Sequence, residues 1–139
     1  MDSASTQIKI NHISIISIPV RDQQVSKSFY VDALGFNVVR DNPFEGETRW
    51  IELAPSGAQT NIVLVTWFEA MPPGSVQGLV LDTSDVEAAH RSLQARGIST
   101  SEIESAPWAR FFTLHDPDGN SLVIQQEPNV NMDAGASGA

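Results

Sequence analysis

The pattern of apolar and polar residues changes period several times along the chain and then repeats. Short apolar or alternating runs, which are typical of strands, flank two segments in which apolar residues recur every three or four positions. Such spacing places the apolar side chains on one face of a helix. The positions concerned are Val25, Phe29 and Ala33 in the first segment, and Val86, Ala89 and Leu93 in the second. The pattern therefore predicts one helix in each half of the chain.

Both predicted helices carry start and stop signals. Asp22 can cap the first helix, and Ser84 with Glu87 can form a capping box at the second. Gly35 and Gly97 follow the last turns, and glycine readily takes the left-handed conformation that ends a helix. The expected helices are Asp22–Leu34 and Asp85–Arg96.

The other apolar segments predict four strands in each half. The first half has Ile8–Val20, Phe36–Arg40, Thr48–Leu53 and Gln59–Phe68, and the second has Val76–Leu81, Ile98–Ile103, Arg110–His115 and Ser121–Gln126. Glu69–Ser75 contains Met71-Pro72-Pro73-Gly74 and is the expected linker. The repeat predicts an α+β fold of two βαβββ modules, 8–68 and 76–127, whose curved mixed sheets enclose a cleft. We expect a disordered N-terminus at 1–7 and a flexible tail at 128–139.

Composition narrows the classes of function. A length of 139 residues favours a single domain, and the net charge of −9 with only eight Lys and Arg opposes binding to nucleic acid. The absence of cysteine excludes disulfides, thiolate metal sites and thiol nucleophiles. The apolar runs are too short to cross a bilayer, so we expect a cytoplasmic protein without a membrane partner. No phosphate-binding loop, dinucleotide fingerprint or Ser-His-Asp set is present.

The first half contains the strings Ile18-Pro19-Val20-Arg21-Asp22, Ser28-Phe29-Tyr30 and Leu34-Gly35-Phe36. The second half contains Asp85-Val86-Glu87-Ala88-Ala89, Ala95-Arg96-Gly97-Ile98 and the closing Asp116-Pro117-Asp118-Gly119-Asn120. In their order and spacing, these strings resemble the two modules of the vicinal oxygen chelate superfamily, which includes glyoxalase I, extradiol dioxygenases, fosfomycin-resistance enzymes and bleomycin-resistance binding proteins. The resemblance covers residues 8 to 127. It implies the glyoxalase/bleomycin-resistance-like fold and a homodimer, in which modules can be exchanged about the linker.

Enzymes of that superfamily hold a divalent metal with inward-facing His and Glu side chains. The resemblance places those ligand positions at Ile15, Val63, Gly78 and Val123. None of these side chains offers an electron pair, whereas a catalytic metal needs about three protein ligands. We therefore expect no metal and no other cofactor.

The predicted pocket follows from the period of two along a strand. If the four former ligand positions face the cleft, alternation adds Ser17, Asn61, Val65, Val80, Asp82 and Gln125. Trp50 could add a stacking surface, and Trp108 could form a lid from its loop, although a tryptophan can equally serve core packing. The predicted ligand-binding residues are Ile15, Ser17, Trp50, Asn61, Val63, Val65, Gly78, Val80, Trp108, Val123 and Gln125. Asp82 is a candidate general base, but capping of the second helix is the role we favour.

Three functional hypotheses remain open at this point. The first is a metal-independent small-molecule binding protein of the glyoxalase/bleomycin-resistance type, holding an apolar or aromatic compound that could be cationic. The second is an enzyme, a lyase, isomerase or dioxygenase-like protein, which is either metal-free or uses relocated metal ligands. The third is a domain with a vestigial pocket.

Overall fold

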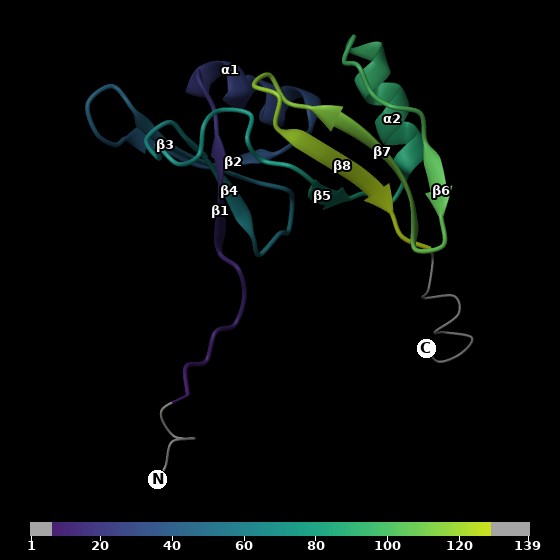
Figure 1. Cartoon of the computed structure of the whole chain (residues 1–139), viewed down its shortest axis with the longest axis horizontal. Helices are drawn as coiled ribbons and strands as arrows, with labels where there is room; N and C mark the ends of the chain where they lie inside the picture. The colour runs from purple at the N-terminus through teal and green to yellow at the C-terminus, as the bar shows by residue number, and fades with distance from the viewer. Residues whose placement is uncertain (1–6, 129–139) are drawn as a thin grey trace.

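The computed structural model describes residues 7–128, in which eight strands form two four-stranded sheets (Figure 1). Sheet A has the order β1-β4-β3-β2, and sheet B has the order β5-β8-β7-β6. Sheet A contains β1 (Ile15–Pro19), β2 (Asn37–Pro43), β3 (Arg49–Ala54) and β4 (Asn61–Val65). Sheet B contains β5 (Leu79–Asp82), β6 (Glu104–Ala106), β7 (Ala109–His115) and β8 (Ser121–Gln126). The predicted α+β fold with a repeated βαβββ order is confirmed.

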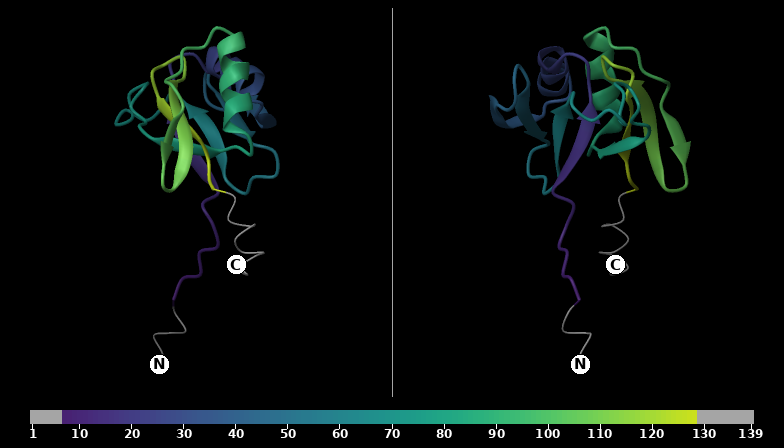
Figure 2. Two further views of the ribbon diagram at one scale, coloured as in Figure 1. Left: turned by 90° about the vertical axis from the view of Figure 1, so that its right-hand side faces the viewer. Right: turned by 60° about the vertical axis from the view of Figure 1, so that its left-hand side comes forward.

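The two sheets are built alike. The first strand of each runs parallel to the last, β1 beside β4 and β5 beside β8, and the other pairs are antiparallel. A parallel pair needs a crossover connection, which here includes the helix that follows the first strand. Both helices lie towards one end of the molecule, while the described chain begins and ends at the other (Figures 1 and 2).

The first helix begins and ends as predicted. Helix α1 (Gln23–Ser28) continues into one wider turn, η2 (Phe29–Ala33), and Asp22 Oδ1 accepts hydrogen bonds from the backbone N–H groups of Gln24 and Val25. Gly35 follows with a φ of 78°. This value lies in the left-handed region, where a side chain would be strained.

The second helix, α2 (Val86–Ala95), begins one residue later than predicted. Its N-cap is Asp85, whose side chain accepts from the N–H of Ala88, so the capping box at Ser84 is wrong. The capping role favoured for Asp82 is also wrong, because Asp82 Oδ1 accepts from Gln125 Nε2 on the neighbouring strand. Aspartate and serine both cap well, so residue type alone could not choose between adjacent positions.

Two strand predictions also need correction. The predicted strand Ile8–Val20 is a strand only at β1. The carbonyls of Ile13 and Ser14 still accept hydrogen bonds from Thr60 and Asn61, and the residues before them extend away from the sheets (Figure 1). Ile8 and Ile10 are each 81% exposed there. The predicted strand Ile98–Ile103 is wrong: β6 follows it, and only an isolated bridge from Thr100 to Leu114 falls within the predicted range. The expected disorder of 1–6 and 129–139 lies outside the described residues.

One hydrophobic core joins the two modules. It contains the helix-facing side chains of both sheets, such as Ile18 and Leu64 of sheet A and Phe112 and Leu122 of sheet B. Polar contacts reinforce the junction, since Asn120 Nδ2 donates to the carbonyl of Pro19 at 2.9 Å. None of the helices within 7–128 has the length and apolarity needed to cross a membrane.

Candidate functional site

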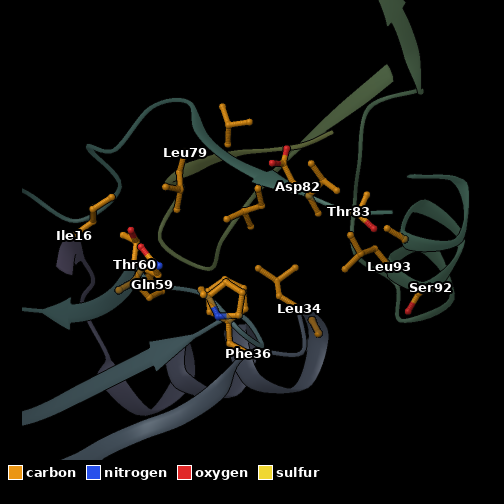
Figure 3. Close-up of a pocket in the computed structure, with 18 residues that line it drawn as sticks. Ile16, Leu34, Phe36, Gln59, Thr60, Leu79, Asp82, Thr83, Ser92 and Leu93 are labelled. Atoms are coloured by element: carbon orange, nitrogen blue, oxygen red, sulfur yellow. The ribbon is translucent and has the colours of Figure 1, made fainter. Parts of the chain in front are cut away.

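A cavity of about 670 Å³ lies between the modules (Figure 3). Its wall is mainly aliphatic and includes Leu34 and Phe36 of the first module and Leu79 and Leu81 of the second. Asp82 adds a polar group. The volume falls in the usual range for small-molecule pockets, roughly 300–1,000 Å³. The cavity is therefore one place where a ligand could be held.

Most of the predicted ligand-binding residues lie elsewhere. Only Val80, together with the catalytic candidate Asp82, lines this cavity. The cavity wall uses the helix-facing side of sheet A, where Ile16 and Ile62 point. Because side chains alternate along a strand, the predicted Ile15 points to the opposite side.

The structure gathers six predicted residues on the surface of sheet A that faces away from α1, which we call the outer face of sheet A. The strand register pairs Ile15 with Asn61 and Ser17 with Val63. The six are Ile15, Ser17, Trp50, Asn61, Val63 and Val65. Val63 and Val65 are each 1% exposed, so other side chains of the chain already cover them.

Three aromatic rings stand at one side of this face. Trp50 and Trp67 stack with ring centroids 6.3 Å apart, and Phe44 packs against them with centroids 5.6 Å from Trp50 and 4.7 Å from Trp67. Phe44 remains 44% exposed. We call these three residues the aromatic cluster. Flat apolar surfaces of this kind favour stacking with another ring.

A buried carboxylate that the sequence analysis missed lies beside the aromatic cluster. Glu52 is 5% exposed, and its Oε1 accepts from Trp50 Nε1 at 3.0 Å and from Arg40 Nε at 3.2 Å. Its Oε2 accepts from Asn61 Nδ2 at 2.6 Å. Burial alone would raise the pKa of Glu52, but the hydrogen bonds from Trp50 and Asn61 and the charge of Arg40 hold that pKa below its usual value. Glu52 is therefore ionised at neutral pH.

Four further predicted residues belong to strands of sheet B. Val80 pairs with Val123, and Asp82 pairs with Gln125, so these four side chains share the surface facing away from α2, the outer face of sheet B. Val80 is 50% exposed. Within residues 7–128, no hydrogen bond or ion pair joins the outer face of sheet B to that of sheet A.

Gly78 and Trp108 lie beside the second sheet. Gly78 precedes β5 with a φ of 74°, and a Cβ atom there would have no neighbour within 4 Å. The positive φ alone explains why glycine stands at this position. Trp108 lies in the turn between β6 and β7 and is 68% exposed.

Comparison with known proteins identifies the family. The model of the Glyoxalase/Bleomycin resistance protein/Dioxygenase superfamily matches residues 9–124. The chain belongs to this superfamily. The crystal structure of TnmS3, an antibiotic binding protein from Streptomyces sp. CB03234, is 43% identical, covers 88% of this chain and 100% of its own, and superposes with a TM-score of 0.84.

Two further proteins are similar to this superfamily member, one at lower sequence identity and one over a shorter segment. A superfamily member from Sphaerobacter thermophilus DSM 20745 is 33% identical over 85% of this chain and 98% of its own, with a TM-score of 0.77. The uncharacterized protein YetH of Bacillus subtilis (strain 168) is 38% identical over 55 residues. That match covers 40% of this chain and 46% of YetH, so it spans just under half the length of the relative.

The residues of this superfamily member do not fit the divalent metal that the family's enzymes use. Ile15, Val63, Gly78 and Val123 stand at the expected ligand positions and carry no donor atom. In the described part of the chain, no three His, Asp or Glu side chains lie close enough together to hold a metal ion. His90 is engaged elsewhere, since its Nε2 lies 2.9 Å from the carbonyl oxygen of Ser101.

Proposed function

We propose that this protein is a cytoplasmic, metal-independent small-molecule binding protein that holds a flat aromatic compound on the outer face of sheet A. The observation that carries the proposal is the combination found there: stacked Trp50 and Trp67, with the 44% exposed Phe44 packed against them, beside few polar groups. Ligand pockets are typically apolar and aromatic, with a small number of polar groups that fix orientation.

The relationship to TnmS3 supports the same class of function. TnmS3 is described as an antibiotic binding protein, and it shares 43% of its residues with this chain over its full length. Shared fold alone is a weak guide to function, since one fold carries many activities. The aromatic cluster supplies the independent, local reason to favour binding here.

A second copy of the chain would supply the opposing wall of the site. The outer face of sheet B exposes half of Val80, and Trp108 stands exposed at its edge. Ile8 and Ile10, in the segment before β1, are also exposed. A homodimer would bury these exposed apolar groups symmetrically.

The proposal is tested by thermal melting with the three-ring aromatic compound 3-hydroxyxanthone as the probe. Bound ligand stabilises the folded state, by about 2.7 kcal/mol when the free ligand is at about 100 times its Kd. We expect the probe to raise the melting temperature of the wild type by several degrees, and Trp50→Ala to abolish most of that rise.

Ala89→Phe is the matched control, because Ala89 lines the cavity between the modules and lies away from the outer face of sheet A. We expect this variant to keep the full rise in melting temperature. Loss of the rise in Ala89→Phe, with retention in Trp50→Ala, would place the ligand in the cavity instead.

A further inference from the structure

Glu52 accepts hydrogen bonds from side chains of three neighbouring strands on the outer face of sheet A. Arg40 comes from β2, Trp50 from β3 and Asn61 from β4. An ionised carboxylate accepts hydrogen bonds and cannot donate them. Each partner must therefore turn a donor towards Glu52. This orientation decides which of the partner's other polar atoms remain available to a ligand.

The orientation of Asn61 follows directly. An amide side chain has a donating nitrogen and an accepting oxygen, and the nitrogen is committed to Glu52 Oε2 at 2.6 Å. Among the described residues, no N–H or O–H group donates to the amide oxygen of Asn61. Asn61 is half-buried on the outer face, so it offers a ligand a hydrogen-bond acceptor.

Arg40 and Trp50 are constrained in the same way. Arg40 gives its Nε–H to Glu52, which leaves the two terminal nitrogens as donors on a side chain that is 57% exposed. Trp50 gives its single N–H, so the indole presents only its rings. The outer face thus offers a cationic donor, an acceptor and a stacking surface, all within reach of one small ring system because they meet at one carboxylate.

We propose that Glu52 is a positioning residue that decides which groups of the site donate and which accept hydrogen bonds from a ligand. The matching ligand is a flat aromatic compound with two polar groups. A hydroxyl of the ligand donates to the amide oxygen of Asn61, and a carbonyl or phenolate oxygen accepts from Arg40. An organic cation is disfavoured, because the charge of Glu52 is buried and already paired while the charge of Arg40 is exposed. This inference rests on the proposed function and narrows its ligand class.

The test compares three flat three-ring probes at about pH 6, where the phenol stays protonated. The probes are 3-hydroxyxanthone, 3-methoxyxanthone, which lacks the donor, and the cation proflavine. One hydrogen bond contributes roughly fivefold in affinity. We expect the wild type to bind the hydroxy compound roughly fivefold more tightly than the methoxy compound, and proflavine most weakly.

The variant Glu52→Gln tests the role of Glu52 more sharply than the comparison of probes on the wild type. The glutamine oxygen can still accept from Trp50 and Arg40, which places its NH₂ group against Asn61. Asn61 must then turn its oxygen inward and its NH₂ group towards the ligand. We expect the preference for the hydroxy over the methoxy compound to disappear in this variant, a change of specificity that simple loosening of the fold would not produce.

Asp41→Asn is the matched control, since Asp41 lies next to Arg40 on β2 but pairs with Lys27 and Arg49 instead. It should keep the wild-type preference. Asn61→Ala should lose the preference, and adding Glu52→Gln to it should change the preference no further. If Glu52→Gln does not fold, the wild-type and Asn61→Ala preferences decide.

Equal affinity of the wild type for the hydroxy and methoxy compounds would overturn the inference while leaving the binding function intact. Retention of the preference in folded Glu52→Gln, or in Asn61→Ala, would also overturn it. Failure of all three probes to bind the wild type would overturn the inference and the proposed function together.

Discussion

At the scale of single residues, Tyr30 and Asp116 form a deeply buried polar contact between the modules. The hydroxyl of Tyr30, which is 0% exposed, donates to Asp116 Oδ2 at 2.8 Å. Asp116 also accepts from the amide of Asn120 and from two backbone N–H groups of its own turn. Burial, and then the charge and hydrogen bond of Asp116, raise the pKa of Tyr30 above its usual value.

Tyr30 is the only tyrosine in the chain, so its titration can be followed without overlap. Its pKa is raised by folding, so its contribution to stability is complete below the unfolded pKa of about 10 and is lost as pH rises above it. We expect absorbance to show no phenolate in the folded protein up to the pH at which the chain unfolds. Tyr30→Phe should reduce the free energy of unfolding by about 1–3 kcal/mol in urea. A phenol that titrates near 10 in the folded protein would contradict this account.

Residue patterns could have revealed more of the site than they did. Glu52 lies two positions after Trp50, so alternation along the strand places it on the same face as that predicted residue. Its burial and three hydrogen bonds depend on side chains from neighbouring strands, and the pairing of those strands cannot be read from one strand's pattern. The same holds for Tyr30 and Asp116, which are 86 positions apart in the chain.

At the scale of elements, an ion-pair network fixes α1 to sheet A. Asp41 of β2 accepts from Lys27 of α1 at 2.7 Å and from Arg49 of β3 at 3.0 and 2.7 Å. The hydrogen bond from Arg49 is the main reason that the pKa of Asp41 falls to about 2 from an ordinary 3.8; burial opposes the change, and Lys27 adds to it.

This network predicts sensitivity to acid. The pKa of Asp41 is lowered by folding, so its contribution to stability is complete above the ordinary value of 3.8 and is lost as pH falls towards 2. Its side chain is 19% exposed, and the shift corresponds to a contribution of about 2 kcal/mol. Asp41→Asn should therefore unfold at lower urea than the wild type at neutral pH, with a gap that narrows near pH 2. A gap that is independent of pH would refute this role.

The pattern predicted the type of each helix and strand more accurately than its boundaries. Residues 7–14 and 98–103 carry strand-like apolar residues, yet a strand also needs a neighbour to complete its hydrogen bonds, and in one chain these segments have almost none. Helix positions were predicted more closely, because capping residues and terminal glycines act locally.

At the scale of the whole molecule, the repeat in the sequence predicts two similar modules but not how their faces meet. The helix-facing sides of both sheets join one core, which leaves the two outer faces apart within a chain. Residues predicted for one cleft are therefore divided between two surfaces, six on sheet A and three on sheet B, with Gly78 and Trp108 beside the latter. Period-two alternation assigns a side chain to a face, whereas the partner of that face is a property of the tertiary or quaternary structure.

The proposed homodimer follows from these separate faces. We expect sedimentation velocity to show a dimer at micromolar concentration. Val80→Asp should shift the population towards the monomer, because it places a second carboxylate near Asp82 on a face that the dimer would bury. Glu87→Gln, on the exposed surface of α2, is the control and should leave the dimer intact. A wild-type chain that sediments as a monomer would refute the shared site.

The most direct test of ligand binding on the outer face of sheet A uses the indole N–H signals of the three tryptophans, Trp50, Trp67 and Trp108, in a nuclear magnetic resonance titration. The protein is first treated with a chelator and then titrated with 3-hydroxyxanthone. Saturable shifts of the Trp50 and Trp67 signals without added metal are the expected result. Binding that leaves both signals unmoved, or that appears only after a divalent metal is added, would contradict the account.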